Sequence, residues 1–550
     1  MKWWGWGDPA QQPELPAHAV EFLRREIGMS HQLRPAVALE AVRCKPPALR
    51  APVHEKLAAA VGADAVRDDR RTRVLHAAGK SYPDLVRQRA GLCDDAPDAV
   101  VFPASHEEVR AVLETCAREA VAVVPFGGGT SVVGGVEPLR DSFDALIALD
   151  LGRCRRMVAL DERSLTAVFE PGLRCPEAEG LLAQRGLTLG HFPQSYEFAT
   201  VGGCVATRSA GQASTGYGRI DKLVLGLRCA TPSGDLELAA MPASAAGPSV
   251  RDLVVGSEGT LGVITQTALR VHPRPPARRY EGWFFRSFRE GAEALRSLEQ
   301  AEAAPHVARL SDEEETRLSL AMAGMRGLKG TAARAYLGAR GYAGGCLMIL
   351  GWEGDERTVV HRRRRGAAQL RRAGGLSMGR APGSAWERTR FAAPYLRDAL
   401  LDRGVMVETL ETAAQWSGLL ELHGAVSGAL RDSLSARGTP PLVACHISHL
   451  YPSGASLYFT FIARQEAEDP IAQWRVAKSA ACDAIVAAGG TITHHHAVGR
   501  DHAPWLEAEI GHVGVTALRA AKEALDPAGV MNPGKLLPAA QPAQAPAAAS

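Results

Sequence analysis

A loop with three consecutive glycines, Pro125-Phe126-Gly127-Gly128-Gly129-Thr130-Ser131, directly follows an apolar segment (121–124) that is typical of a buried strand. Glycine has no Cβ, so the backbone N–H groups of such a loop can turn inward and approach an anion closely. A Rossmann fingerprint would lead straight into a helix, whereas Val132-Val133-Gly134-Gly135-Val136 follows here, and the lysine of a P-loop is missing. The loop therefore predicts a pyrophosphate site without a helix N-terminus behind it.

Further glycine-dense turns lie at 194–203, 207–211 and 256–265, each beside short strand-like segments. Several such loops can surround one long planar ligand, and the ring system and pyrophosphate of a flavin dinucleotide both need close backbone approach. We expect the following residues to contact the cofactor: Pro125, Phe126, Gly127, Gly128, Gly129, Thr130, Ser131, Gln194, Ser195, Tyr196, Glu197, Phe198, Ala199, Thr200, Gly202, Gly203, Thr207, Arg208, Ser209, Ala210, Glu258, Gly259, Thr260, Leu261, Gly262, Val263 and Ile264.

Three consecutive histidines, His494, His495 and His496, follow a predicted strand and turn at 488–492. Neighbouring side chains on a strand point to opposite faces, so this spacing does not favour a metal site, and we expect none. A histidine cluster at a strand end suits proton transfer or hydrogen bonding inside a pocket. A purely structural role remains the alternative, although adjacent imidazoles are costly to bury without partners.

The composition is that of an ordinary globular protein of two or three domains, with 550 residues, 46% apolar and 22% charged. A net charge of +3 argues against a broad nucleic-acid surface. The ten cysteines form no CxxC pair, which predicts buried reduced thiols. No secretory signal and no apolar run of about 20 residues are present. We expect a cytoplasmic protein, with peripheral membrane contact as the alternative.

Changes in pattern along the chain indicate five parts. We expect an N-terminal helical segment (1–92), a cofactor-binding domain (93–273), an α/β substrate-binding cap domain (274–480), a C-terminal segment that returns to the first domain (481–537) and a disordered Pro- and Ala-rich tail (538–550). Within the second part, 99–103 reads as a strand, and Ser105 with Glu108 predicts the start of a helix that runs to about Glu119.

The glycine loop at 125–131, the Thr-Val-Gly-Gly turn at 200–203 and the run Gly-Ser-Glu-Gly-Thr-Leu-Gly-Val-Ile-Thr at 256–265 together resemble the vanillyl-alcohol-oxidase/PCMH flavoprotein superfamily. The resemblance implies an α+β fold, with a two-subdomain FAD-binding domain of the PCMH type and a second α/β cap domain. Many members tether FAD through a histidine of the first loop. Thr130 and Ser131 stand there in this chain, which implies a non-covalently bound FAD.

Other segments resemble one branch, the alkyldihydroxyacetonephosphate synthase (alkylglycerone-phosphate synthase) family. They are the opening Met-Lys-Trp-Trp-Gly-Trp-Gly (1–7), Arg-Leu-Ser-Asp (309–312), Tyr-Leu-Arg-Asp (395–398), the tyrosine in Leu-Tyr-Pro-Ser-Gly-Ala (450–455), and the histidine triplet. The likeness covers roughly residues 1–537. D-lactate dehydrogenases and glycolate oxidases of the same superfamily share the glycine loops, but usually carry Glu-His-Gly at the triplet.

The chain departs from the family pattern at four positions. Gln194 stands where Asp is common, and Ala497 replaces a glycine after the triplet. His446 and His449 stand where Arg and Gln are usual, which changes the charge of the substrate pocket.

The resemblance implies a redox-neutral exchange: the acyl chain of 1-acyl-dihydroxyacetone phosphate leaves as a carboxylate and a long-chain alcohol replaces it, with oxidised FAD as electron sink and carrier. Tyr451 falls on the family's catalytic tyrosine, and the histidines at 494–496 would move protons. Arg397 would bind the phosphate, and Arg309 the ester or the departing carboxylate. Small-molecule lipid partners, no nucleic acid and a homodimer complete these expectations.

Two rival functions stay open at this point. One is an FAD-dependent 2-hydroxy-acid dehydrogenase or oxidase acting on D-lactate or glycolate. The other is a flavin-binding, membrane-associated protein without turnover. Two features are compatible with membrane contact: the basic run at 361–372 and the tryptophans Trp3, Trp4 and Trp6. A solvated helix face and a packed N-terminal clasp are the simpler interpretations of these two features.

Overall fold

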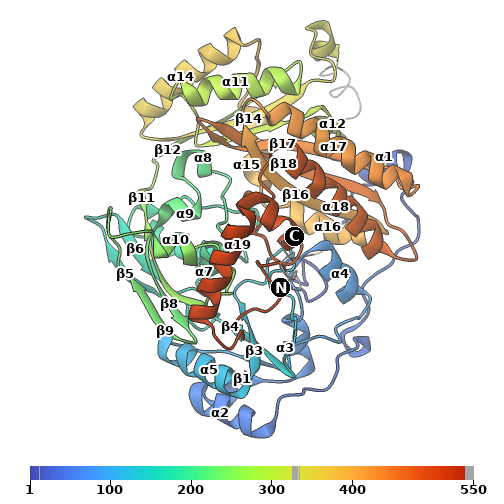
Figure 1. Cartoon of the computed structure of the whole chain (residues 1–550). Coiled ribbons are helices and arrows are strands. Elements are labelled where there is room, and N and C mark those ends of the chain that lie inside the picture. The colour runs from blue at the N-terminus through green and yellow to red at the C-terminus, as the bar shows by residue number, and fades with distance from the viewer. Residues whose placement is uncertain (12, 325–331, 333–334, 539–550) are drawn as a thin grey trace, which may run out of the picture.

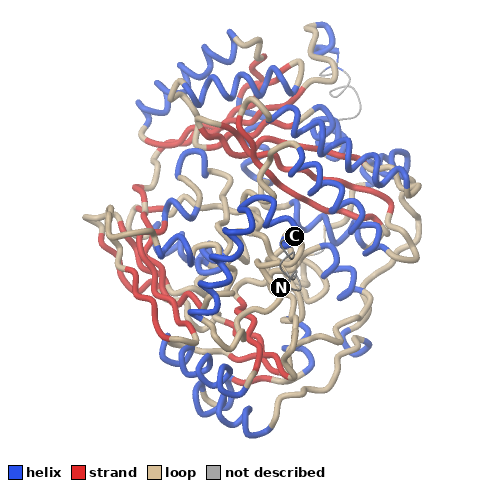
Figure 2. Tube along the Cα trace, in the orientation of Figure 1, coloured by secondary structure: helices blue, strands red, loops and turns tan. Residues whose placement is uncertain are grey.

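The computed structural model describes residues 1–538 except 12, 325–331 and 333–334. The expected disordered tail lies outside the described residues, apart from Pro538. Figure 1 shows two lobes: a lower one built on small sheets, and an upper one built on a single large sheet. The strands gather into these separate bodies, with loops between them, in Figure 2.

The first sheet of the lower lobe has the strand order β1-β2-β4-β3. Its strands are β1 (Val66–Arg67), β2 (Ala99–Val101), β3 (Val121–Phe126) and β4 (Ala145–Asp150), and β2, β4 and β3 run parallel. Helix α5 (His106–Glu119) begins where the sequence predicts, because the Ser105 side chain accepts the Glu108 backbone N–H at 3.2 Å. The Glu108 carboxylate accepts from the Ala104 N–H, one residue before the expected position.

The second sheet is antiparallel, with the order β5-β6-β10-β8-β9. Its strands are β5 (Met157–Asp161), β6 (Thr166–Phe169), β8 (Val224–Thr231), β9 (Gly234–Leu238) and β10 (Val263–Arg270). Short helices and a small β7–β11 pair surround it: α6 (Cys175–Ala183), α7 (Val201–Ala206), α8 (Ser214–Tyr217), α9 (Ile220–Leu223), α10 (Val250–Val254), β7 (Leu187–Thr188) and β11 (His272–Pro273).

The upper lobe is one antiparallel sheet with the order β15-β12-β14-β13-β17-β18-β16. Its strands are β12 (Ala277–Phe285), β13 (Val307–Ser311), β14 (Cys346–Gly354), β15 (Leu376–Gly379), β16 (Val405–Gln415), β17 (Leu442–Tyr451) and β18 (Gly454–Arg464). One face packs on α11 (Phe288–Gln300), α14 (Glu356–Arg372), α17 (Leu419–Ala436) and α18 (Pro470–Ala487), and α12 (Glu313–Met322), α15 (Arg380–Thr389) and α16 (Ala393–Leu401) lie on the other.

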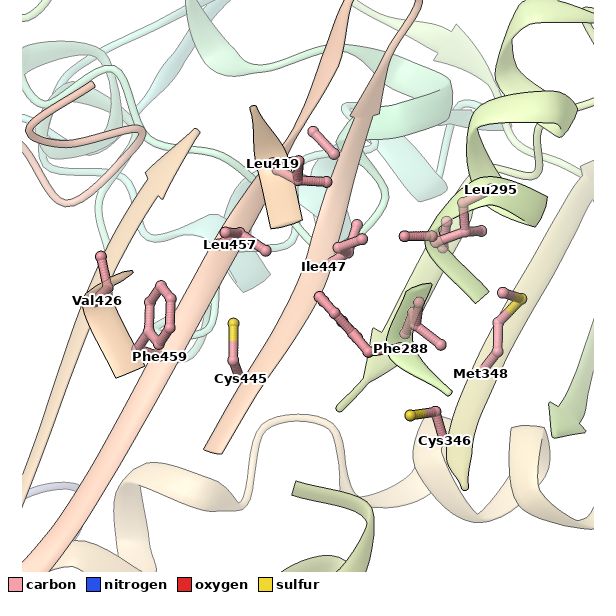
Figure 3. Close-up of a cluster of buried hydrophobic side chains, with 14 of the residues drawn as sticks. Phe288, Leu295, Cys346, Met348, Leu419, Val426, Cys445, Ile447, Leu457 and Phe459 are labelled. Carbon is pink, nitrogen blue, oxygen red and sulfur yellow. The ribbon is translucent and has the colours of Figure 1, made fainter. Parts of the chain in front are cut away.

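Alternation along β17 and β18 decides which side chains enter the core of the upper lobe. Cys445, Ile447 and Phe459 point into the hydrophobic core against α11 and α17 (Figure 3). The residues that alternate with core residues along each strand, such as His446 on β17 and Tyr458 on β18, therefore face the opposite side of the sheet, where a cavity lies.

The N-terminal clasp, residues 1–11, packs between the lobes. The buried Lys2 ammonium pairs with the Asp398 carboxylate of α16 at 3.1 Å, and that carboxylate also accepts the Trp6 backbone N–H. The Trp6 indole meets the ring of Phe198 edge to face, at 5.5 Å. The helices that follow are α1 (Ala17–Ile27), α2 (Ala51–Val61), α3 (Arg70–Leu75) and α4 (Tyr82–Arg89), with single 3-10 turns at Leu39–Ala41 and Ala63–Ala65.

The C-terminal segment returns to the lower lobe through a 3-10 turn (Ala503–Trp505) and α19 (Leu506–Leu525). Met531 forms a parallel bridge with Val123 of β3. The Asn532 amide donates to the backbone oxygens of Gly135 and Glu258. Met531 and Asn532 are thus part of the glycine-loop region.

The basic run on α14 is in part structural. The Arg363 guanidinium donates to the buried Glu281 carboxylate at 2.6 Å, and Arg371 lies over the Trp283 ring. No helix within the described ranges is both long and apolar enough to cross a bilayer.

Replacing Asp398 with Ala should destabilise the protein, because it leaves the buried Lys2 charge unpaired. Removing one partner of a buried ion pair costs about 3–5 kcal/mol. We expect a loss of this size in denaturant unfolding, together with faster hydrogen exchange in residues 1–11. Asp8→Ala, at an exposed position of the same segment, is the control. An unchanged exchange rate in Asp398→Ala would show that the ion pair does not hold the clasp.

Candidate functional site

A cavity of about 1370 Å³ is lined by residues of both lobes. Its lower wall is made by the glycine-rich loops. Its upper wall is made by the face of the large sheet that lies opposite α11, α14, α17 and α18. The part of the lining that α1, α12 and α16 contribute is largely apolar and is called the apolar arm; it includes Phe22, Leu23, Leu318, Leu396 and Leu400.

Most of the residues predicted to bind the cofactor border this cavity. The lining includes Pro125, Phe126, Gly127, Gly128, Gly129, Thr130, Ser131, Gln194, Ser195, Ala199, Thr200, Gly202, Gly203, Thr207, Ser209, Ala210, Glu258, Gly259, Gly262, Val263 and Ile264. Loops that lie up to 140 positions apart in the sequence therefore share one surface.

Six predicted residues lie behind this surface: Tyr196, Glu197, Phe198, Arg208, Thr260 and Leu261. Their side chains are engaged within the protein. The Glu197 carboxylate accepts a hydrogen bond from Tyr395, at 2.8 Å, and the Arg208 guanidinium donates to the Val255 backbone oxygen, at 3.0 Å. These residues shape the loops from behind.

The first glycine loop fits a dinucleotide. A Cβ on Gly128 would lie 2.0 Å from the Phe198 backbone oxygen, and one on Gly127 would lie 2.5 Å from the Thr200 Oγ1. Only glycine allows this loop to lie so close to the 198–200 segment, and both segments then present backbone atoms to the cavity. The space left between them suits a ligand that needs close backbone approach over a long surface.

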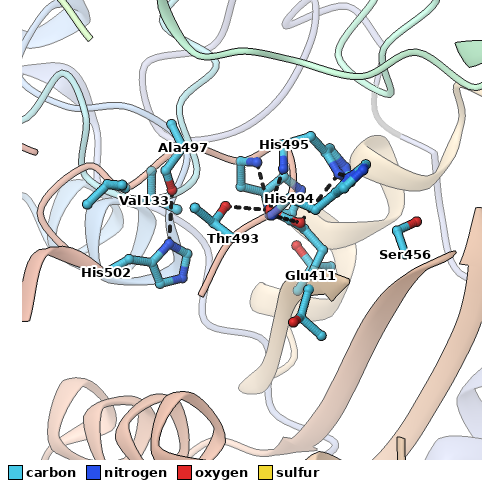
Figure 4. A network of polar contacts seen from close by, with 12 residues as sticks. Val133, Glu411, Ser456, Thr493, His494, His495, Ala497 and His502 are labelled. Carbon is cyan, nitrogen blue, oxygen red and sulfur yellow. Dashed lines mark hydrogen bonds and ion pairs between the residues drawn. The ribbon is translucent and has the colours of Figure 1, made fainter. Parts of the chain in front are cut away.

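The histidine triplet lies in a loop, and the strand predicted at 488–492 is wrong. Helix α18 runs to Ala487 and a turn follows. The backbone N–H groups of 494–496 all point to one acceptor, the Glu411 carboxylate of β16, with distances of 3.0 Å from His495 and 2.7 Å from His496. Thr493 donates its hydroxyl to the same carboxylate, at 2.6 Å (Figure 4).

Because the triplet is not extended, neighbouring imidazoles meet. The Nδ1 atoms of His494 and His495 lie 2.9 Å apart, and the Nε2 of His494 lies 2.6 Å from the Tyr451 hydroxyl. His495 and His496 line the cavity, whereas His494 and Tyr451 lie behind them. The tyrosine expected at the substrate is therefore separated from the cavity by two imidazoles.

A different tyrosine, Tyr458 of β18, lines the cavity. Its ring stacks on His446 at 4.9 Å and lies edge to face with His496 at 5.4 Å. The β17–β18 register shifts between Ile447 and Leu450, so Leu450 lies in the core and Tyr451, at the end of the hairpin, is on the same face of the sheet as Tyr458. The Tyr451 hydroxyl is bonded to His494, and Tyr451 does not border the cavity. A shift of this kind changes which side chains face the cavity, and no sequence pattern announced it.

Burial sets the protonation of these groups. It lowers the pKa of His494 to about 3 and lowers the pKa of His495 and His496 below their ordinary range, although the Glu411 carboxylate acts in the opposite direction. Burial raises the pKa of Tyr458 to about 12, and Arg397 opposes that shift. The imidazoles are therefore neutral at neutral pH.

The two arginines predicted to bind substrate both line the cavity but differ in their partners. Arg309 donates to the Glu315 carboxylate at 2.7 Å and contacts His446 at 3.1 Å. The Glu315 carboxylate also lies 2.9 Å from His446 Nδ1. Burial acts to raise the pKa of Glu315, but the Arg309 guanidinium and the contact with His446 lower it to about 2. Arg309 is thus already paired.

Arg397 is largely unpaired. Its Nη1 donates to the Lys80 backbone oxygen at 2.7 Å. Its Nε and Nη2 are buried without a hydrogen-bond acceptor, and the Glu408 carboxylate is 3.9 Å from Nη2. A buried guanidinium with two free donors at a cavity wall is suited to an anionic ligand.

Sequence reasoning missed Glu411, Glu315 and Arg219. Arg219 donates to the His494 backbone oxygen at 2.7 Å and fixes the triplet from below. A signal for Glu411 was present: it is one of two buried carboxylates in strand β16, which has no other charged residue. A charge on such a strand requires a partner, but the sequence does not say which.

Comparisons with known proteins agree with this geometry. Residues 97–239 match the family described as "FAD binding domain", and residues 274–536 match "FAD linked oxidases, C-terminal domain". A p-cresol methylhydroxylase structure has the same fold, with a TM-score of 0.66 at 15% identity over 88% of this chain and 96% of that one. The protein is therefore an FAD-binding enzyme of the PCMH fold class.

Closer relatives give the family. Alkyldihydroxyacetonephosphate synthase from Dictyostelium discoideum is 33% identical over 98% of this chain and 93% of its own length. A solved structure of an alkyldihydroxyacetonephosphate synthase is 32% identical, with a TM-score of 0.85 over 98% of this chain and 99% of that one. The chain belongs to the alkyldihydroxyacetonephosphate synthase family. The predicted family, α+β fold and FAD cofactor are confirmed.

Gly128→Ala should abolish FAD binding, since its methyl group would force the first loop away from the 198–200 segment. We expect purified protein without flavin absorbance. Gly180→Ala, at an exposed helical position with open space around a Cβ, is the matched control and should keep one FAD per chain. A yellow Gly128→Ala protein would show that the loop does not cradle the cofactor.

Acidification should unfold the protein through its buried histidines. Their pKa values are lowered in the folded state, so below about pH 6.5 the unfolded chain binds protons that the folded chain does not. The free energy of unfolding should fall by about 1.4 kcal/mol per pH unit for each such histidine. The lowered pKa of Glu411 adds a loss of the same sign at lower pH.

Denaturant titrations between about pH 7.5 and 5 measure this slope. His496→Gln should reduce it by the contribution of one histidine. The exposed His31→Gln is the control and should leave it unchanged. Equal slopes in all three proteins would contradict the assignment.

Proposed function

We propose that this chain exchanges the acyl chain of 1-acyl-dihydroxyacetone phosphate for a long-chain alcohol, forming the ether bond of an ether-lipid precursor. The observation that carries the proposal is a single cavity that combines an unsatisfied guanidinium, a tyrosine facing neutral imidazoles, glycine-lined cofactor loops and an apolar arm. Each of these features meets a separate requirement of the reaction.

Arg397 is our proposed phosphate ligand. Its Nε and Nη2 donors are buried without acceptors, and the planar guanidinium matches two phosphate oxygens. The apolar arm between α1, α12 and α16 would hold the acyl chain and then the alkyl chain of the alcohol.

Tyr458 is our proposed catalytic tyrosine, in place of Tyr451. It lies on the cavity wall, with its ring beside those of His495 and His496. In the proposed step its oxygen takes a proton from the carbon next to the ketone, while its own proton passes to a neutral imidazole. A second proton leaves the incoming alcohol, and His496 is the proposed acceptor. Tyr451 and His494 would orient His495 from behind.

Arg309 keeps one of the two roles expected for it. Its ion pair with Glu315 already uses one side of the guanidinium, so it would hold the substrate ester through the remaining donors. FAD, when bound along the glycine loops, supplies an electron sink that makes the exchange possible without net oxidation. No histidine or cysteine stands in the 125–131 loop, so we propose a non-covalent FAD that acid precipitation releases into the supernatant.

A homodimer and peripheral membrane contact stay predictions. Sedimentation of the purified protein, alone and with anionic vesicles, measures both. They bear on where the lipid substrate enters and do not alter the chemistry proposed for the cavity.

The experiment that tests the function incubates FAD-loaded protein with acyl-dihydroxyacetone phosphate and labelled hexadecanol, without an electron acceptor. Label should appear in an alkali-stable lipid, since an ether resists hydrolysis. Tyr458→Phe should lower this rate by at least about 100-fold, the usual contribution of a positioned acid–base group. Tyr451→Phe, the matched variant, should lower it by less, because its hydroxyl acts through His494.

The reverse order would return the catalytic role to Tyr451. Absence of the labelled ether in the wild type, with flavin reduction by D-lactate or glycolate, would identify a 2-hydroxy-acid dehydrogenase instead.

Arg397→Met should raise KM for the phosphate substrate, because the two free donors vanish while the apolar stem is kept. Loss of a hydrogen bond to a charged group costs about 1.5–3 kcal/mol, equivalent to roughly 10- to 150-fold. Steady-state kinetics with the same ether assay measure this, and Arg357→Met, at an exposed position of α14 outside the cavity, is the control. An unchanged KM in Arg397→Met would remove Arg397 from the phosphate site.

A further inference from the structure

Three imidazoles gather at one point on the cavity wall: His449 of β17, and His494 and His495 of the triplet. Each offers a ring nitrogen, and the three nitrogens all lie within 4.8 Å of one another. Within the part of the chain that the structure describes, no other group of three histidine, cysteine or acidic side chains meets this condition. On a strand, neighbouring side chains would point to opposite faces, and for that reason the sequence did not predict a metal site. The triplet lies in a loop, where neighbouring side chains can converge.

His449 is the member that needs an explanation. It is 3% exposed, and its Nδ1 has no hydrogen-bond partner. Its ring stacks on His494 at 5.1 Å and meets His495 edge to face at 5.4 Å, so all three rings share one space. A buried nitrogen without a partner is costly, and a bound ligand would remove that cost.

The spacing of the nitrogens suits a small divalent cation. Zinc binds imidazole at about 2.0–2.1 Å, and in a tetrahedral site the ligand nitrogens lie about 3.3 Å apart. The Nδ1 atoms of His494 and His495 are 2.9 Å apart, so a small rotation of the rings would admit the ion. In doing so the ion would replace the proton that these two nitrogens share.

Charge also favours a cation. The buried Glu411 carboxylate lies 3.4 Å from His495 Nδ1 and 3.9 Å from His496 Nδ1. It is the negative charge closest to the three rings, and it would compensate part of the charge of a divalent ion. His449 and His495 line the cavity, which leaves the fourth coordination position open to water or to a ligand oxygen.

We propose that His449, His494 and His495 form a binding site for Zn²⁺, with Glu411 as the neighbouring counter-charge. The site is specific to ions that prefer imidazole, since none of the three ligands is an oxygen. Binding would occupy the nitrogen through which His494 contacts His495. Zinc is therefore an inhibitor of the proposed reaction; binding itself rests on the geometry alone, and the inhibition rests on the proposed function.

The test uses the FAD-loaded full chain after treatment with a chelator. Zn²⁺ is titrated by equilibrium dialysis, and bound metal is measured by elemental analysis. We expect one Zn²⁺ per chain in the wild type. Loss of an outer-shell partner of a metal site weakens binding by about 10- to 100-fold, so removal of a ligand in His449→Gln should exceed about 100-fold.

The control variant is His446→Gln. His446 lies on the same strand and in the same cavity, but both its ring nitrogens are engaged by Glu315 and Arg309. This variant should keep one zinc per chain. Equal affinities for Zn²⁺ in His449→Gln and wild type would overturn the proposal. A wild-type protein that retains no zinc would also overturn it, and that result does not depend on whether any variant folds.

Co²⁺ is a second probe because it gives visible bands in a tetrahedral site. Such bands should form at one equivalent and disappear when Zn²⁺ is added. A spectrum of octahedral, hydrated cobalt would overturn the three-histidine site. Inhibition of ether formation by Zn²⁺, reversed by chelator, is measured separately, so a failure of the proposed function leaves the binding result readable.

Discussion

The site depends on one buried carboxylate. Glu411 is fully buried on β16, and it accepts three consecutive backbone N–H groups and the Thr493 hydroxyl. Backbone donors that converge on one acceptor cannot also pair with a strand, so the triplet is forced into a turn that brings its imidazoles together. The same charge acts to raise the pKa values of His495 and His496, against the lowering effect of burial. Without Glu411 the histidines would have neither this arrangement nor this effect on their pKa values.

The two walls of the cavity are built by different physical means. On the lower wall, glycines let backbone segments approach each other more closely than any side chain permits. On the upper wall, strand alternation sends large apolar side chains to one face and polar ones to the other. A cofactor that needs backbone contact and a substrate that needs side-chain chemistry thus meet where two kinds of surface face each other. The N-terminal clasp, held by Asp398, joins both lobes at this junction.

Much of the fold could be predicted because its signals are local. The Ser105 cap, the buried strand before the first glycine loop and the loop itself lie within short windows of sequence. The partners within the site could not, since they depend on contacts between residues that lie 83 to 275 positions apart: Glu411 with the triplet, Arg219 with His494, and Asn532 with the glycine turn at 256–265. The choice between Tyr451 and Tyr458 depends on the packing of the triplet, because Tyr451 is bonded to His494 whereas Tyr458 borders the cavity. The register shift between Ile447 and Leu450 also changes the faces of the residues just before Tyr451. Alternation predicts faces only where pairing is regular.

The order of the chain has a consequence for biosynthesis. Met531 bridges β3 next to the first glycine loop, and Asn532 holds Gly135 and Glu258 in place. These contacts come from a segment that lies more than 400 residues after the strand it supports. A nascent chain therefore carries an incomplete cradle until residues 531 and 532 have been synthesised, and we expect FAD to load only after that point. Any C-terminal truncation that removes this segment would be expected to behave as an apoprotein even though every glycine loop is intact.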